Sequence, residues 1–240
     1  MLKKAKNYKP WLSAAFYWWP ISLLTLLLFF AIFGSWIAPF DPDRQNLLAR
    51  LKDPGFEARG AVYWLGSDEL GRDVLSRVIH GAKVSISVAF LSVILSGSVG
   101  VAVGMAAGYL RGWSETILMR LVDIFLSIPA ILLAIITVAV LGPGFINVIL
   151  VLSLTRWPRY ARVAYGQTLT IANRPYVTLA HAMGASAPRI LVMHILPNIV
   201  GPLLVVATLE FGLMVLFEAG LSFLGLGVQP PTASWGSMLS

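Results

Sequence analysis

Cysteine is absent from this chain of 240 residues, and charge is scarce, because only 12% of the side chains are Asp, Glu, Lys or Arg. The lack of cysteine excludes disulfide scaffolds, cysteine-based zinc sites and thiol catalysis. An average soluble domain is about 25% charged, so this composition argues against folding in water. A hydrophobic content of 58% excludes intrinsic disorder. The chain is therefore expected to be an integral membrane protein.

Motifs for catalysis and cofactor binding are also missing. The sequence has no H-E-x-x-H pair for zinc, no G-x-x-x-x-G-K-[ST] loop for ATP and no G-x-S-x-G nucleophile elbow. Its histidines, His80, His181 and His194, are scattered along the chain. We therefore expect no catalytic residue, no metal site and no cofactor.

Long uncharged stretches predict an all-α, polytopic bundle with five membrane-spanning helices, since a span needs about 20 mostly apolar residues. Trp18 and Trp19 precede the first span and Trp36 ends it, as expected for aromatic residues at both interfaces. The expected spans are 20–38, 84–108, about 116–141 with a kink at Pro129, a fourth that begins near Phe145 and passes through Arg156, and about 199–223.

The distribution of basic residues predicts the orientation of these spans. Lys3, Lys4, Lys6 and Lys9 precede the first span without an acid, and Arg156, Arg159, Arg162, Arg174 and Arg189 follow the start of the fourth. Both basic segments should face the cytoplasm, and an even number of spans between them is consistent with this. The Arg156, Arg159 and Arg162 side chains are expected to snorkel at the end of the fourth span. Because orientation explains the basic residues, we expect no nucleic-acid partner.

The expected organisation follows from this orientation. A cytoplasmic N-terminus and an unbroken first span indicate an uncleaved signal-anchor. The loop 41–83, in which acids and bases balance, would lie on the extracytoplasmic side. The segments are 1–19, the basic N-terminus; 20–38, the first span; 39–83, the extracytoplasmic loop; 84–223, the four-helix core, with a cytoplasmic loop at 166–198; and 224–240, an extracytoplasmic segment.

Two carboxylates, Glu210 and Glu218, lie inside the expected fifth span. A charge in a span is costly and usually faces the bundle interior or a wet cavity. Residues eight apart lie within about 80° on one helix face. Glu210 and Glu218 therefore either line or gate a translocation path, or satisfy polar partners between helices, with Glu218 alternatively near the outer interface.

The cytoplasmic stretch 167–198 is too polar to span the membrane. A helix is expected over 176–183, and Gly184 should end it. A second helix is expected over 187–196, with Pro188 in its first turn and Pro197 marking the return to the membrane. Two short helices that meet at a glycine form a compact knob. The knob is either a docking surface or a re-entrant interfacial hairpin.

The extracytoplasmic loop contains turn signals at Asp41-Pro42 and at Asp53-Pro54-Gly55. Apolar residues recur at helical spacing between 68 and 80, which predicts an amphipathic helix there. This helix would either meet an external protein or lie on the membrane surface and cap the bundle.

Three stretches of the sequence resemble one known family. Residues 176–186 (YVTLAHAMGAS), followed by HILPN at 194–198, resemble the EAA loop of bacterial ATP-binding-cassette importer permeases. WLGSDELGRDVLSR at 64–77 and LSFLGLGVQPPT at 221–232 are similar to the C-type permease of dipeptide, oligopeptide and nickel importers. The resemblance covers nearly the whole chain, in order.

The resemblance implies a type I importer permease fold in the inner membrane. It also implies a heterodimer with a second permease, two cytoplasmic ATPases that hydrolyse ATP, and an extracytoplasmic substrate-binding protein. The helix 176–186 would be the coupling helix, seated in a groove of one ATPase and moved as ATP closes the ATPases. The expected docking residues are Tyr176, Thr178, Leu179, Ala180, Met183, Gly184, Ala185 and Pro197.

The sequence departs from the family pattern at two points. Thr178 stands where the loop has its acidic residue, so docking would depend on packing, on neutral hydrogen bonds or on Arg174 and Arg189. Five spans are predicted against the family's six, so a shortened sequence is expected.

Several functions remain open at this point. The resemblance favours import of a di- or oligopeptide, with a nickel chelate or a glutathione-like peptide as alternatives. A different class of protein, a secondary transporter that uses Glu210 and Glu218 as an ion relay, would be favoured by an inverted repeat, and no internal repeat is evident. A non-transporting assembly factor is the third class.

Overall fold

The computed structural model describes residues 10–58 and 61–239, so the lysine-rich start of the chain lies outside the described residues. The described residues belong to two compact units, Met1–Ile86 and Ser87–Ser240. Helix α2 begins in the first unit and ends in the second. The helices are α1 Pro10–Ile37, α2 Val74–Leu110, α3 Gly112–Ser127, α4 Ala130–Leu141, α5 Phe145–Ala172, α6 Pro175–Ala182, α7 Ala187–Ile190 and α8 Leu196–Phe223.

The first unit contains α1, a compact loop and the start of α2. A Cβ atom on Gly34 of α1 would lie 2.6 Å from Cγ2 of Ile79, so the two helices cross closely at this glycine. Trp18, Trp19 and Trp36 are exposed, as expected for anchors at the two ends of a span. The loop also holds a short 3₁₀ helix, Leu47–Ala49, and an antiparallel hairpin, β1 Phe56–Ala58 and β2 Ala61–Tyr63, which the sequence did not predict.

The amphipathic helix expected over 68–80 is wrong in its first half. Residues 68–73 form a turn, and the helix begins at Val74 and runs without a break into the second span. The Asp68 carboxylate accepts hydrogen bonds from the backbone N–H groups of Leu70 and Arg72, and Asp73 accepts one from the N–H of Ser76. Side chains that bond nearby N–H groups in this way favour turns and helix N-termini over helix interiors.

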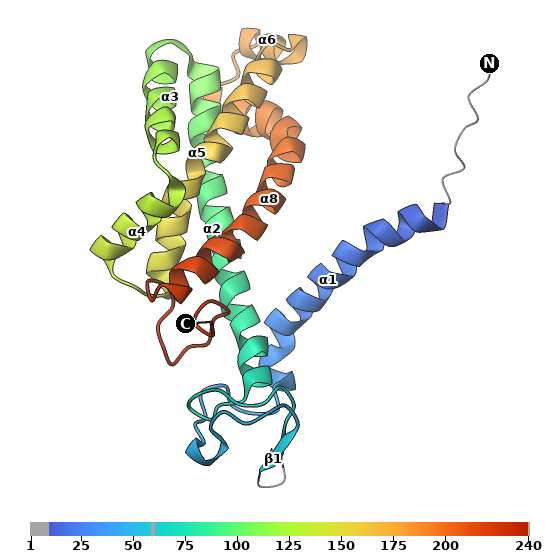
Figure 1. The fold of residues 1–240 in the computed structure, drawn as a ribbon. Coiled ribbons are helices and arrows are strands. Elements are labelled where there is room, and N and C mark those ends of the chain that lie inside the picture. Colours follow the sequence, from blue (N-terminus) through green and yellow to red (C-terminus); the bar gives the residue numbers. More distant parts are fainter. Residues whose placement is uncertain (1–9, 59–60, 240) are drawn as a thin grey trace, which may run out of the picture. The chain divides into compact units, whose positions relative to one another are not determined.

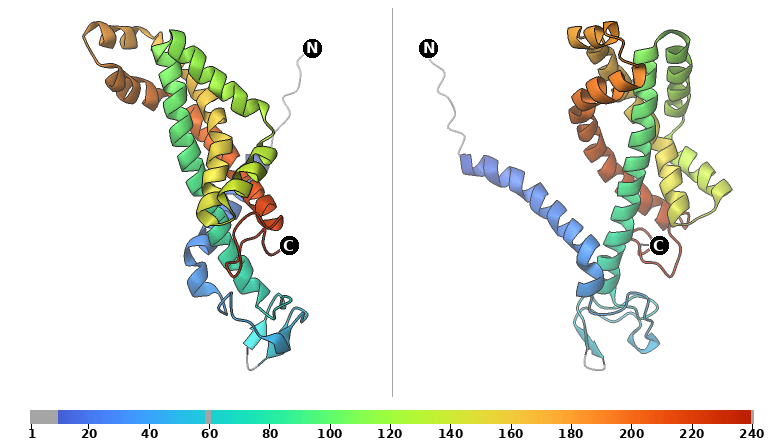
Figure 2. Two further views of the ribbon diagram at one scale, coloured as in Figure 1. Left: turned by 90° about the vertical axis from the view of Figure 1, so that its left-hand side faces the viewer. Right: turned by 180° about the vertical axis from the view of Figure 1, so that it is seen from behind.

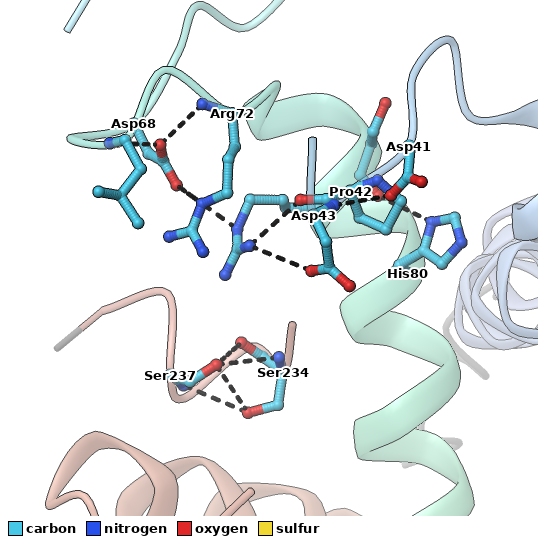
Figure 3. Close-up of polar contacts among 11 residues, drawn as sticks. Asp41, Pro42, Asp43, Asp68, Arg72, His80, Ser234 and Ser237 are labelled. Carbon is cyan, nitrogen blue, oxygen red and sulfur yellow. Dashed lines mark hydrogen bonds and ion pairs between the residues drawn. The ribbon is translucent and has the colours of Figure 1, made fainter. Parts of the chain in front are cut away.

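Charged side chains hold this turn together (Figure 3). Arg72 Nε lies 2.6 Å from Asp68 Oδ2, and Arg77 lies between Asp68 and Asp43 at 3.6 and 3.8 Å. Partial burial of Asp68 opposes ionisation. The hydrogen bonds from Arg72 and Leu70 outweigh this burial and hold the pKa of Asp68 below its ordinary value.

The second unit is a bundle in which α5 packs against α3, α4 and α8. Figures 1 and 2 show α6 and the segment after α8 at opposite ends of this unit. The aromatic pair Phe125 and Trp157 makes an edge contact between α3 and α5 at 5.4 Å. Arg162 of α5 pairs with Asp123 of α3, and the Tyr165 hydroxyl donates to Glu115.

Three glycines at intervals of four residues bring α2 against α5. A Cβ on Gly100 would overlap the Trp157 carbonyl oxygen, one on Gly104 would overlap that of Ala161, and one on Gly108 would crowd Thr168. Small residues at this spacing allow membrane helices to approach closely. The spacing is visible in the sequence, but it does not identify α5 as the helix that it meets.

The third predicted span is broken rather than kinked. α3 ends at Ser127 and α4 begins at Ala130, and their axes differ by 92°. Ile128 is extended, because the residue before a proline is disfavoured in the α region, and Pro129 precedes the first residue of α4. The chain also breaks between α4 and α5 at Gly142-Pro143-Gly144, where both glycines have positive φ.

By length and composition, three described helices can cross a membrane: Trp18–Ile37, Val74–Leu110 and Ala187–Phe223. The bent pair α3 and α4 makes a fourth if it is counted as one span. α5 is long enough, with 28 residues, but contains Arg156, Arg159 and Arg162. The count of five spans therefore remains a prediction.

Candidate functional site

The predicted knob is a helical elbow, defined here as residues 175–190. α6 ends in a Schellman motif, in which Gly184 N–H donates to His181 O and Ala185 N–H donates to Ala180 O, both at 3.0 Å. Gly184 has a φ of +84°, a conformation that residues with a Cβ rarely adopt. This confirms the sequence prediction that Gly184 ends the first helix, and it fixes the angle at which the chain enters α7.

One side of the elbow is anchored to the bundle. Val177 of α6 is buried with Ile190, Ile195 and Ile199, in a cluster that also contains Met105 of α2. The Tyr176 ring lies 6.4 Å from that of His194. Burial of these apolar groups makes the elbow part of the bundle rather than a loose hairpin.

The other side of the elbow carries most of the predicted docking residues. Leu179 and Met183 are one helical turn apart, and they are 63% and 87% exposed. Tyr176, Thr178 and Gly184 are also exposed, whereas Ala180 and Ala185 are half-buried. Exposed apolar side chains that gather on one face are typical of a contact surface.

The second helix of the knob does not end at 196, contrary to the prediction, and the chain continues as a helix past Pro197. α7 continues through a π-helical segment, Leu191–Ile195, directly into α8. Proline lacks the N–H that would bond the carbonyl four residues earlier, and a wider π turn accommodates that loss. Pro197 is exposed in the first turn of α8, beyond the elbow itself.

A buried ion-pair cluster lies at the contact between α5 and α8. Arg156 Nη1 is 3.4 Å from Glu210 Oε2, and Arg159 Nη1 is 3.2 Å from Glu210 Oε1. The side chains of Arg156 and Glu210 are each only 3% exposed, whereas that of Arg159 is 53% exposed. The guanidinium of Arg156 also lies 4.1 Å from the centre of the Phe217 ring, a cation–π contact.

This cluster corrects one prediction. Arg156 does not snorkel: it is buried because Glu210 supplies a counter-charge within the bundle. Glu210 has polar partners between the helices and also lines the groove described next, so both alternatives for Glu210 remain predictions. An acid and an arginine within expected spans are visible in the sequence, but their pairing is not.

A groove of about 850 Å³ opens beside the cluster, between α3, α5 and α8. Its polar groups are Arg159, Arg162, Thr208 and Glu210. Apart from Gly212, the rest of the lining is aliphatic and consists of Leu126, Val163, Val206, Leu209, Leu213 and Leu216. The groove is thus mostly apolar and carries a small number of charged side chains, a composition typical of sites that bind small molecules.

Glu218 is not part of this groove. It is completely buried, and its Oε1 accepts a hydrogen bond of 2.7 Å from the Ser222 hydroxyl. Ser222 Oγ in turn accepts the N–H of Val228, in the segment that follows α8. Within the described residues, Glu218 Oε2 has no hydrogen-bond partner. The two carboxylates therefore lie in different surroundings, although they share one helix.

Taken together, the long apolar helices, the broken α3–α4 pair, the charged groove and the elbow define a class of protein, a polytopic helical permease. Residues 100–240 match the family described as the binding-protein-dependent transport system inner membrane component, and residues 21–54 match the N-terminal transmembrane domain of oligopeptide transport permease C. The chain belongs to the first of these families, as its motifs suggested.

Curated relatives cover most of the chain. It is 43% identical, over 90% of its length and 72% of the relative, to the di/tripeptide transport system permease protein DppC of Pseudomonas aeruginosa. It is 40% identical to the probable D,D-dipeptide transport system permease protein DdpC of Escherichia coli, over 91% of this chain and 72% of the relative. Identity to the glutathione transport system permease protein GsiD of Pectobacterium atrosepticum is 37%, over 90% and 70%.

A solved structure confirms the fold. The inward-facing MetNI methionine ABC transporter aligns with a TM-score of 0.57 and 22% identity, over 67% of this chain and 77% of that chain. The expected all-α permease fold of ATP-binding-cassette importers is therefore confirmed. The chain is a multi-pass inner-membrane permease subunit.

Proposed function

We propose that this permease imports di- or oligopeptides and is driven by separate cytoplasmic ATPases that dock on the elbow. The observation that carries the coupling is the exposed pair Leu179 and Met183, presented by a helix whose angle Gly184 fixes and whose underside Val177 anchors. A rigid, anchored projection with an apolar tip can transmit a push to the bundle as a rigid-body movement.

Docking on this elbow depends on packing. Thr178 stands where the EAA loop that this segment resembles has an acidic residue; it is exposed, and its hydroxyl donates to Arg174 O. It therefore offers an ATPase no charge. The remaining docking residues are Tyr176, Leu179, Ala180, Met183, Gly184 and Ala185, with Pro197 at the margin.

The proposed assembly has four further components. A second, homologous permease completes the translocation path, two ATPases bind on the cytoplasmic side, and an extracytoplasmic protein delivers the substrate. The names of the relatives support this substrate class, because they specify dipeptides, tripeptides and glutathione. We assign the N-terminus and the elbow to the cytoplasm, because the start of the chain carries four lysines and the segment 156–189, which leads into the elbow, carries five arginines, both without an acid. The segment boundaries given above follow this orientation.

The rival function, an ion relay through Glu210 and Glu218, has weaker support. Glu210 is already paired with two guanidinium groups between α5 and α8, at 3.4 Å from Arg156 and 3.2 Å from Arg159. A relay would also need the two carboxylates to share a path, whereas only Glu210 lines the groove. Loss of uptake in Glu218→Gln with the assembly intact would revive this function.

Uptake measurements distinguish the two functions. The chain is expressed with its partner permease, ATPases and binding protein in cells that lack their own peptide importers. Import of a labelled dipeptide is then measured. We expect uptake to stop when ATP is depleted and to persist when an uncoupler abolishes the proton gradient at constant ATP. Uptake that follows the proton gradient and ignores ATP would contradict the proposed function. Glutathione and a nickel chelate serve as competing substrates.

A further inference from the structure

We propose that Arg159 binds the carboxylate of the peptide as it passes the groove, so that this permease contributes to the choice of an anionic substrate end. The inference rests on the proposed function and goes beyond it, because it assigns a binding residue and the chemical group that this residue recognises. The site consists of Arg159, its partner Glu210 and the aliphatic walls of the groove.

The charge of the cluster is the first observation. Two guanidinium groups, of Arg156 and Arg159, share the single carboxylate of Glu210, so the cluster carries one net positive charge. Arg156 is enclosed by Glu210 and the Phe217 ring, which leaves the surplus charge on Arg159 at the groove surface. The other arginine of the groove, Arg162, pairs with Asp123. A net positive group in a mostly aliphatic groove, whose other arginine is already paired, favours a negatively charged ligand.

The position of Arg159 is the second observation. It lies fourteen residues after Phe145, the first residue of α5, which is about 21 Å along a helix that rises ~1.5 Å per residue. The hydrocarbon core of a bilayer is about 30 Å thick. A half-exposed arginine at that depth is costly unless it faces a water-filled path or a counter-ion. Its exposed side faces the groove, where a passing carboxylate would supply that counter-ion.

The shape of Arg159 and of the groove is the third observation. One Nη of Arg159 lies against Glu210, and this contact orients the planar guanidinium, which retains further N–H donors for a ligand. Ligand pockets for small molecules occupy about 300–1,000 Å³, and the groove holds about 850 Å³. Leu209, Leu213 and Leu216 offer contact to the side chains of many peptides without discrimination. The groove would thus bind the carboxylate of the peptide specifically and accept many different side chains.

The test compares a free acid with its amide. The complete importer is reconstituted in vesicles, and initial rates of ATP-driven uptake are measured for alanyl-alanine and for its C-terminal amide. Each compound is supplied at a concentration that saturates the binding protein. Arg159→Gln should lower the acid-to-amide ratio of rates about tenfold, the effect of one lost charge-assisted hydrogen bond. Arg159→Lys, which keeps the charge but not the planar fork, should lower the ratio roughly threefold.

Controls separate this role from a structural one. Arg120→Gln removes the same charge from an exposed position of α3 that does not line the groove, and it should leave the ratio unchanged. An equal loss for acid and amide in Arg159→Gln would show that Arg159 only supports the structure or pairs with the second permease, and would overturn the proposal. An unchanged ratio would overturn it too. If Arg159→Gln does not assemble, an unchanged ratio in Arg159→Lys has the same force.

The carboxylate site can be refuted while the proposed function still holds. If the wild-type importer takes up both compounds with ATP and the variants do not alter the acid-to-amide ratio, the carboxylate site alone is refuted. A wild-type importer that shows no ATP-driven uptake of either compound would contradict the proposed function itself.

Discussion

Glu210 of α8 and Arg156 of α5 form an ion pair at 3.4 Å, and both side chains are almost completely buried. Removal of one partner of a buried pair typically costs about 3–5 kcal/mol, because the other charge stays buried without compensation. The cluster has one acid and two bases, so the two removals are unequal. Glu210→Gln strands both arginines, whereas the loss of Arg156 leaves Glu210 paired with Arg159.

We therefore predict that Glu210→Gln lowers the stability of the protein in detergent more than Arg156→Met does. The double variant Arg156→Met with Glu210→Met should recover most of the loss. Arg159→Gln, which changes a half-exposed pair, should cost no more than about 1 kcal/mol. Tryptophan fluorescence during thermal unfolding measures the order of the four variants. Equal stability of Glu210→Gln and the wild type would show that the pair does not hold α5 to α8.

The glycine contact between α2 and α5 gives a matched pair of substitutions. Gly104→Ala places a methyl group against the Ala161 carbonyl oxygen, so we expect a loss of about 1–3 kcal/mol. Gly166→Ala, on α5, meets nothing within 4 Å, so it should be neutral or stabilising by up to about 1 kcal/mol. Denaturant unfolding of the two variants tests the contact. A destabilised Gly166→Ala beside an unaffected Gly104→Ala would contradict the packing described here.

The elbow gives a prediction about coupling. Gly184 meets no neighbour that a Cβ would strike, so the cost of substitution comes from its left-handed backbone alone. That cost is about 1–2 kcal/mol for most residues and less for asparagine. Gly184→Val should therefore distort the elbow and reduce both ATPase co-purification and uptake, whereas Gly184→Asn should retain most of both. If Gly184→Val transports and binds ATPase normally, the elbow is not the docking element.

The loop before α2 gives a prediction about pH. Burial of Asp68 raises its pKa, but the hydrogen bonds from Arg72 and Leu70 together outweigh burial, so the pKa is lowered in the folded state. Its contribution to stability is therefore complete above the unfolded value, about 3.9, and is lost as the pH falls through the lower folded value. Hydrogen exchange of the Leu70 and Arg72 amides should show constant protection from about pH 5 to 8, and Asp68→Asn should weaken it throughout. Protection that declines between pH 7 and 5 would exclude Asp68 as the cause.

Local signals in the sequence predicted the helices and the elbow well. Gly184 ends α6 because a residue with a left-handed backbone is needed there. Long uncharged stretches predict the spanning helices because the hydrocarbon core of a membrane excludes charged side chains. The failures occur where tertiary contacts decide. Asp68 and Asp73 bond backbone N–H groups and delay the start of α2 to Val74, and a π segment carries the chain past Pro197.

The groove could not be predicted for the same reason. Glu210 stands out in the sequence as a costly charge, but its partners lie 51 and 54 residues earlier in the chain, on another helix. Periodicity places a residue on a face of its own helix and does not identify the helix that this face meets. The exposed Arg159 beside a buried Arg156 likewise became visible only when α5 and α8 were packed together.

The central claim is that the elbow faces the cytoplasm and meets an ATPase there. The chain has no cysteine, so Met183→Cys introduces its only thiol at a position that is 87% exposed. Leu48→Cys, in the loop assigned to the opposite side, is the matched control. A membrane-impermeant maleimide should label Met183→Cys in inverted vesicles alone and Leu48→Cys in intact spheroplasts alone, and bound ATPase should protect the first. Labelling of Met183→Cys in intact spheroplasts would contradict the account.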